Sequence, residues 1–98
     1  MKRPTFTSEA KIDLAEITAF LAEEAGIATT RRVIMTIKTA CAFLNQTPGA
    51  GHSREDLTNK PVRFWQVYSY LIVYDPTPRP IRIIRVLHGN RDVTGILN

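Results

Sequence analysis

The stretch that decides the fold is YLIVYDPTPRPIRIIRVLHGNRD, residues 70–92. Residues 70–74 are apolar on both alternating faces, a pattern that predicts a central strand covered on both sides. Three prolines within residues 75–80 favour a turn, because proline fixes φ and lacks a backbone donor. Residues 81–88 form a second apolar run rich in β-branched side chains. The stretch therefore predicts two antiparallel strands joined by a proline-rich turn.

The segment just before this pair continues the sheet. Residues 62–68, VRFWQVY, are rich in aromatic and β-branched side chains and predict another strand. It is separated from the next run by a single residue, so the three strands are expected to form an antiparallel meander. Residues 47–51, TPGAG, are expected to end the helix that precedes them. The chain from there to residue 61 is expected to be a surface loop.

Two helices precede the sheet. Ser8 is the expected N-cap of the first helix, and Gly26 is expected to end it. Its apolar stripe consists of Ala10, Leu14, Ile17 and Leu21. Its acidic flank consists of Asp13, Glu16, Glu23 and Glu24. The second helix is expected to run to about residue 45, with an apolar face of Val33, Ile34, Ile37, Ala40, Cys41 and Leu44. The short connection predicts an antiparallel hairpin.

These elements define the predicted fold class. Residues 1–6 contain Pro4 and fit an edge strand or an extended lead-in. The order strand, helix, helix, three strands predicts an α+β fold, with a two-helix hairpin on one face of a small antiparallel sheet. We expect a single domain over residues 1–98. The last two strands are apolar on both faces, so the second face needs cover from a partner, a second copy or the C-terminal tail.

Composition excludes several classes of function. The single cysteine, Cys41, rules out an internal disulfide and a zinc site built from several cysteines. Gly49 and Gly51 do not form a phosphate loop, because the GxxxxGK[ST] pattern and a preceding strand are both missing. We expect neither a metal nor a cofactor. No apolar run approaches the roughly 18 residues of a membrane span, and no signal-peptide pattern opens the chain, so a cytoplasmic location is expected.

The net charge of +4 is unevenly distributed. Residues 1–48 carry six Lys and Arg against five Asp and Glu, whereas residues 49–98 carry seven against four. A basic C-terminal half suggests an acidic partner, either an acidic protein segment or a nucleic acid. Seven cations spread over half of the chain form no dense stripe, so direct nucleic-acid binding stays an open question.

Four side chains near the end of the last strand are candidates for contact with a target. Arg85, His88, Arg91 and Asp92 lie where this strand leads into the tail. Two arginines, an imidazole and a carboxylate suit binding of an anion or a partner surface. By the two-residue period of a strand, Arg85 and His88 lie on opposite faces and are not expected to serve one site. The alternative is that Asp92 pairs with an arginine and caps a final helical turn.

Nearly the whole chain resembles the ParE/RelE superfamily of toxins from bacterial type II toxin–antitoxin modules. The most specific segments are YLIVY at residues 70–74 and IIRVLHGNRD at residues 83–92. The first helix carries a loose form of the family pattern, made of Ser8, Ala10, Asp13, Leu14 and Ile17. The second ends in FL at residues 43–44, followed by Pro48 and Gly51. The order and spacing of the two C-terminal segments resemble the ParE branch.

A departure from the ribonuclease members of the superfamily helps to choose the branch. By resemblance, RelE-type ribonucleases place an arginine where this chain has Leu71, and the chain has no tyrosine after Tyr74. RNA cleavage through the 2′-hydroxyl needs a base, an acid and cations. His88 with Arg63 and Arg85 supplies only part of that set. A ribosome-dependent mRNA endonuclease is therefore the alternative function.

Resemblance to ParE toxins implies a protein that poisons DNA gyrase without being an enzyme. It also implies a ParD-like antitoxin that holds the toxin inactive by packing along the helical hairpin and the sheet. The residues expected to contact this antitoxin are Ile12, Ala15, Ala19, Trp65 and Tyr74. A third possibility is a relative that has lost toxicity and only binds its antitoxin.

Overall fold

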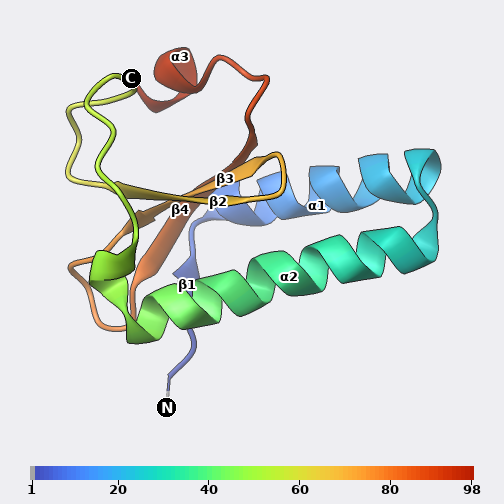
Figure 1. The fold of residues 1–98 in the computed structure, drawn as a ribbon, viewed down its shortest axis with the longest axis horizontal. Coiled ribbons are helices and arrows are strands. Elements are labelled where there is room, and N and C mark those ends of the chain that lie inside the picture. Colours follow the sequence, from blue (N-terminus) through green and yellow to red (C-terminus); the bar gives the residue numbers. More distant parts are fainter. Residues whose placement is uncertain (1) are drawn as a thin grey trace.

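The computed structural model describes residues 2–98 of the chain. The elements, in order, are β1 (Thr5–Phe6), α1 (Ser8–Glu24), α2 (Ile27–Gln46), the 3-10 turn η1 (Pro48–Ala50), β2 (Arg63–Val67), β3 (Tyr70–Asp75), β4 (Arg82–His88) and α3 (Val93–Leu97). The two long helices form an antiparallel hairpin along one face of the sheet, and the end that carries their connection projects beyond it (Figure 1). The predicted α+β fold is confirmed.

The sheet has four strands in the order β1-β4-β3-β2. The predicted antiparallel meander of β2, β3 and β4 is present. The sheet as a whole is mixed rather than antiparallel, because β1 pairs with β4 in the parallel direction, with Thr5 opposite Arg82. The edge strand expected within residues 1–6 is thus found at Thr5–Phe6, the last two residues of that segment. Met1 lies outside the described residues. The first strand and the last are neighbours.

The start of α1 differs from the prediction by one residue. The N-cap is Thr7, whose side-chain oxygen accepts a hydrogen bond from the backbone N–H of Ala10 at 3.0 Å, so Ser8 as N-cap was wrong. The Thr7 hydroxyl also donates to the carbonyl of Ile84 at 2.7 Å, which ties the helix start to β4. At the far end Gly26 separates the two helices with φ of 87°, a value that favours glycine.

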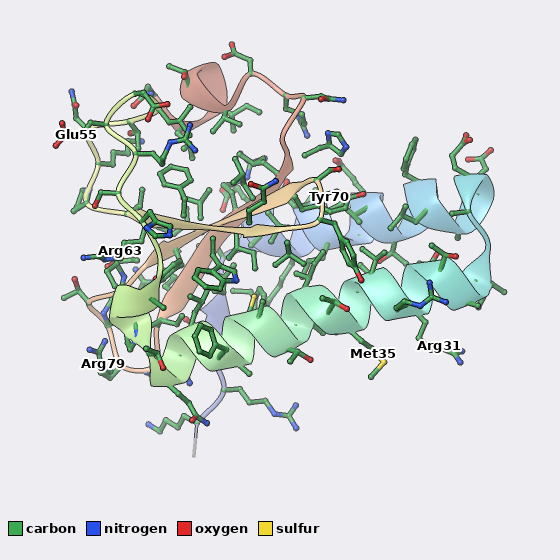
Figure 2. The ribbon with its side chains drawn as sticks, viewed as in Figure 1. Arg31, Met35, Glu55, Arg63, Tyr70 and Arg79 are labelled. Carbon is green, nitrogen blue, oxygen red and sulfur yellow. The ribbon has the colours of Figure 1, made fainter. Side chains whose placement is uncertain are left out.

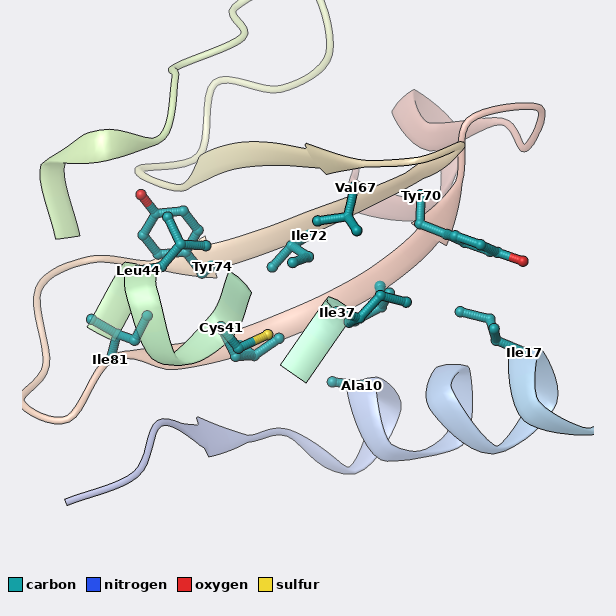
Figure 3. Close-up of a cluster of buried hydrophobic side chains, with 12 residues drawn as sticks. Ala10, Ile17, Ile37, Cys41, Leu44, Val67, Tyr70, Ile72, Tyr74 and Ile81 are labelled. Carbon is teal, nitrogen blue, oxygen red and sulfur yellow. The ribbon is translucent and has the colours of Figure 1, made fainter. Parts of the chain in front are cut away.

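The main core lies between the helical hairpin and the sheet (Figure 3). The predicted apolar face of α2 is confirmed, since Ile37, Cys41 and Leu44 are fully buried there. The sheet contributes the buried residues Val67, Tyr70, Ile72, Tyr74, Ile83 and Val86, and Ile81 just before β4 is buried with them. Burial of this apolar surface is what fixes the hairpin on the sheet.

One tyrosine links the core to the segment after α2. Tyr74 is 0% exposed, and its hydroxyl donates to the carbonyl of Pro48 at 2.7 Å while accepting the N–H of Gly51 at 2.9 Å. A side chain at Gly51 would overlap the tyrosine ring. The end of α2 and the start of the long loop are therefore held against β3.

The second face of the sheet is covered by the chain itself. The residues buried there are Val62, Phe64, Val73, Leu87, Val93 and Leu97, of which the last two belong to α3. The tail is fastened by Asn98, which accepts the Thr58 hydroxyl at 2.8 Å and donates to the Leu57 carbonyl at 2.9 Å. Of the three covers that the sequence left open, the structure has the tail. Within residues 2–98 the tail and the long loop thus bury much of the second face of the sheet.

Large apolar side chains are exposed mainly on the helices. They are Ile12 and Phe20 on α1, Ile27, Met35 and Phe43 on α2, and Tyr68 after β2. Neither helix of the hairpin, nor any other helix within residues 2–98, has the length and apolar character needed to cross a membrane. The apolar surface that remains for a partner lies on the hairpin.

Candidate functional site

A pocket of about 280 Å³ lies between α1 and the ends of β3 and β4. Its lining, called here the α1–β4 pocket, consists of Asp13, Glu16, Ile17, Phe20, Tyr70, Val86, His88 and Arg91. Two of the four predicted target-contact residues, His88 and Arg91, therefore share one pocket. The four lining residues of α1 were not predicted as site residues, although their spacing places them on one helical face.

An ion pair joins Asp13, one of the lining residues of this pocket, to Arg85 of β4. The Nε and Nη2 atoms of Arg85 donate to the Asp13 carboxylate at 2.8 and 2.9 Å, and the backbone N–H of Val86 donates to the same carboxylate at 2.9 Å. The hydrogen bonds to Asp13 hold the pKa of Arg85 above its ordinary value. Asp13 is 4% exposed. Of the acidic flank named in the sequence, Asp13 is therefore buried and paired.

The short β1 explains why this ion pair forms. β1 ends after two residues, so the edge of β4 beyond Ile83 has no neighbouring strand. Thr7 bonds the carbonyl of Ile84, and Asp13 bonds the N–H of Val86. The first turns of α1 thus satisfy backbone groups that a longer strand would otherwise pair. Arg85 reaches Asp13 along this open edge.

The predicted relationship between Arg85 and His88 holds for their positions in the strand. Arg85 is opposite Val73, which belongs to the second-face cluster, whereas His88 is opposite Tyr70, which belongs to the main core. Opposed residues share a face, so the two positions lie on opposite faces. A register shift beside Val73 leaves Ile84 without a partner residue in the β3–β4 ladder. The Arg85 side chain nevertheless reaches α1, where it binds Asp13 of the pocket lining.

His88 is oriented by two contacts. Its Nδ1 accepts the backbone N–H of Asn90 at 3.1 Å, and its ring meets the ring of Tyr70 edge-on at a centroid distance of 5.3 Å. An accepting Nδ1 assigns the hydrogen of the neutral ring to Nε2. In that tautomer the side chain presents the Nε2–H as a hydrogen-bond donor.

Tyr70 forms one wall of the pocket. It is 7% exposed, and burial raises the pKa of its phenol. Its ring closes one end of the main core and its hydroxyl points away from that core, toward the side where Ile17 lies (Figure 3). Within residues 2–98 this hydroxyl makes no hydrogen bond to a protein group, and it is not a fully buried atom. A hydroxyl that lines a pocket and is bonded to no protein group is available to a ligand.

Asp92 has the local role that was the alternative prediction. Its carboxylate accepts the N–H of Gly95 at 3.0 Å and caps α3. No arginine within residues 2–98 lies at ion-pair distance from it. The predicted cap is confirmed, and the predicted ion pair is wrong. Asp92 is not part of the α1–β4 pocket.

The three residues of the ribonuclease alternative do not converge. Arg63 on β2 is opposite Tyr74, at the other end of β3 from Tyr70 and His88. Figure 2 shows Arg63 and Tyr70 at opposite ends of the sheet. The Nη1 atom of Arg63 donates to the carbonyl of Gly51 at 2.7 Å, and Arg85 is bound to Asp13. The three side chains therefore form no single site.

The five predicted antitoxin contacts fall into three groups. Ile12, Ala15 and Ala19 are exposed on the outer side of α1. Trp65 is half-buried, with ring centroids 5.5 Å from Phe43 and 6.5 Å from His52. Tyr74 is fully buried with both hydroxyl bonds satisfied inside the fold, so its selection as a contact residue was wrong.

Metal-binding side chains are dispersed. In the part of the chain that the structure describes, no three His, Cys, Asp or Glu side chains lie close enough together to hold a metal ion. Cys41 on α2 is buried in the main core, and burial raises the pKa of its thiol to about 12. The chemistry available at the α1–β4 pocket is therefore that of hydrogen-bond donors, charges and apolar contact.

Comparisons with known proteins agree with this geometry. A family model described as the ParE toxin of the type II toxin–antitoxin system parDE matches residues 5–93. A solved structure titled "Chromosomal ParDE TA system from P. aeruginosa" is similar in fold, with a TM-score of 0.75 and 19% sequence identity. The match covers 90% of this chain and 96% of that chain. No curated protein matches in sequence.

Proposed function

This chain belongs to the ParE toxin family, and from that membership we propose that it is the toxin of a type II toxin–antitoxin module that inhibits DNA gyrase in the cytoplasm. We further propose that a ParD-like antitoxin neutralises it by direct binding. The single observation that carries this proposal is the family match, which spans both long helices, the whole sheet and the His88 to Arg91 segment. The whole chain would act as one toxin domain.

The α1–β4 pocket supports binding rather than catalysis. Its imidazole is a donor, because Nδ1 is occupied by the Asn90 N–H. General-base chemistry needs a free basic atom within reach of the proton to be removed. Arg85, which a phosphoryl-transfer site would need as a free cation, is bound to Asp13. These contacts favour a gyrase inhibitor over an mRNA endonuclease.

The exposed apolar residues of the hairpin support an antitoxin partner. Ile12, Phe20, Ile27 and Met35 are each more than half exposed. Coupled folding of a disordered segment on such a surface commonly buries on the order of 1,000–3,000 Å². The net charge of +4 suits an acidic segment, so added salt should lower the association rate more than it raises the dissociation rate.

The test of the target is a supercoiling and cleavage assay with purified gyrase. We expect loss of supercoiling and accumulation of linear DNA once the protein is denatured in the reaction mixture. A parallel assay follows a message translated on ribosomes, and we expect no cleavage. Message cleavage that disappears in a His88→Ala variant would establish the ribonuclease alternative instead. A relative that only binds its antitoxin would be silent in both assays.

The antitoxin is tested by co-purification and calorimetry with the protein encoded beside this gene. We expect a tight complex that abolishes gyrase inhibition. A protein that is monodisperse, binds no apolar dye and has no affinity for the neighbouring gene product would contradict the antitoxin part of the proposal.

A further inference from the structure

The α1–β4 pocket gathers three hydrogen-bond donors that have no acceptor. They are the hydroxyl of Tyr70, the Nε2–H of His88 and the guanidinium of Arg91, and within residues 2–98 none of them is bonded to a protein group. Tyr70 is more than nine-tenths buried as a residue, whereas its hydroxyl is not a fully buried atom and is reached by solvent. Three donors that line one pocket and are bonded to no protein acceptor suit an acceptor-rich group, a carboxylate or a phosphate.

The remaining walls select against a phosphate. Glu16 lies on the pocket lining, and the buried charge of Asp13 is already neutralised by Arg85. A dianion would meet the Glu16 carboxylate with twice the repulsion that a monoanion meets. The pocket therefore suits a single carboxylate, placed toward His88 and Arg91 and away from Glu16.

The volume and the apolar walls define what the carboxylate is attached to. Ile17, Phe20 and Val86 give the pocket an apolar floor and side. Its volume of about 280 Å³ is at the lower limit of pockets for free small molecules, roughly 300–1,000 Å³. One apolar side chain with an adjacent acidic side chain fits such a space better than a nucleotide does.

We propose that the α1–β4 pocket receives an acidic residue and its apolar neighbour from the antitoxin. The carboxylate would accept hydrogen bonds from Tyr70, His88 and Arg91, and the apolar side chain would lie against Phe20 and Ile17. This inference rests on the proposed function, because it takes the partner to be an antitoxin. It gives neutralisation a steric basis, since the bound segment covers His88 and Arg91, the residues proposed to meet the target.

The direct test is an NMR titration of the labelled protein with an acetylated tetrapeptide amide, alanine-leucine-glutamate-alanine. We expect amide shifts centred on the pocket residues of α1 and β4. The same peptide with glutamine in place of glutamate should bind about tenfold more weakly, because it lacks the charge that strengthens the hydrogen bonds. Equal binding of the two peptides, shifts centred elsewhere, or the absence of any shift would overturn the inference. So would stronger shifts from inorganic phosphate, which would make the pocket a phosphate site.

Matched variants separate the pocket from general effects. Tyr70→Phe removes only the hydroxyl and should weaken peptide binding about tenfold, whereas Tyr68→Phe, at an exposed tyrosine outside the pocket, should leave it unchanged. Arg91→Gln should weaken binding similarly, and Arg31→Gln on α2 controls for the change in net charge. Unchanged binding in both pocket variants would contradict the inference.

The neighbouring antitoxin distinguishes failure of this inference from failure of the proposed function. If it binds the unmodified protein and the Tyr70→Phe and Arg91→Gln variants equally tightly, the pocket assignment fails and the toxin–antitoxin proposal stands. If it does not bind the unmodified protein and gyrase is unaffected, the proposed function fails. The pocket is then left without its antitoxin ligand, and this inference fails with it.

Discussion

Asp13 and Arg85 form a bidentate ion pair that joins α1 to β4 across 72 residues of sequence. The carboxylate is almost completely buried and accepts a third hydrogen bond from the backbone of Val86. All of its bonds therefore depend on one strand, and they hold the helix that lines the α1–β4 pocket. The pair is a structural support for α1, and its Asp13 carboxylate is occupied by bonds within the fold.

Substitution of Arg85 should lower the stability of the folded protein. Arg85→Ala leaves the buried Asp13 carboxylate without its counter-charge, and we expect a loss of about 3–5 kcal/mol in the free energy of unfolding. Arg82→Ala on the same strand removes an exposed arginine, and should cost less than about 1 kcal/mol. Guanidinium denaturation measures both. An Arg85→Ala variant as stable as Arg82→Ala would show that the ion pair adds nothing.

Stability should fall at alkaline pH because of Cys41. The folded pKa of about 12 lies above the ordinary value of 9.0, so the unfolded thiol ionises at a pH where the folded thiol stays neutral. Its contribution is complete below pH 9 and is lost as the pH rises toward 12, with about 1.4 kcal/mol lost by about pH 10. Urea unfolding across this range should show a smaller loss in Cys41→Ala. If the unmodified protein and Cys41→Ala lose stability equally as the pH rises, the loss comes from the ionisation of tyrosines and not of Cys41.

Because Gly51 lies against the ring of Tyr74, adding a methyl group at residue 51 should lower the free energy of unfolding. Gly51→Ala would force the tyrosine ring away and break its two hydrogen bonds, and we expect a loss of about 1–3 kcal/mol. Gly49→Ala is the matched control, because a Cβ atom there meets nothing within 4 Å. Thermal unfolding of the two variants is the measurement. Equal melting temperatures would mean that the loop moves aside without cost.

The tail should behave as part of the core. Leu97→Ala removes a buried side chain from the second-face cluster, and we expect a loss of about 2–3 kcal/mol with increased binding of an apolar dye. Ile27→Ala removes a side chain that is 72% exposed and should change neither quantity. A Leu97→Ala variant that is as stable as Ile27→Ala would mean that α3 is only loosely docked.

Arg91 should separate toxicity from stability. Its side chain is exposed and makes no hydrogen bond within residues 2–98, so Arg91→Ala should change the free energy of unfolding by less than about 1 kcal/mol. We expect the variant to lose toxicity in cells that lack the antitoxin. Arg31→Ala on α2 should stay toxic. If Arg91→Ala stays fully toxic, the tail is not the target-binding surface, and the helical hairpin becomes the better candidate.

Local patterns were sufficient to predict most of the fold. The apolar period of α2 and the three prolines after Asp75 mark their elements directly, and the structure has them where expected. The parallel pairing of β1 was not predictable in this way, because two residues carry no periodic signal and the partner strand is far away in sequence. The packing of the tail on the second face was likewise not predictable, because it depends on tertiary contacts and not on a local pattern. The family, by contrast, was evident from the two C-terminal segments and is confirmed by the family match.

The site was predicted less completely than the fold. His88 and Arg91 were found because they stand close together in the sequence. Tyr70 and Phe20 were missed because apolar and aromatic residues at strand and helix spacing predict core equally well. Asp13 had a signal that was not used, since its position between Ala10 and Ile17 places a carboxylate on the buried side of α1. A charge on an apolar stripe indicates a buried partner.

The pairing of Thr5 with Arg82 also sets the order in which the chain can be completed during translation. Synthesis delivers the two long helices first, and they leave the ribosome with their apolar faces uncovered. The first strand has no partner until β4 has been made, and Asp13 has no counter-charge until Arg85 follows. Such distant contacts form late, because the long loop between them must first be closed. A chain that stalls before residue 82 therefore has neither the finished sheet nor the pocket, because both need β4 and the residues after it.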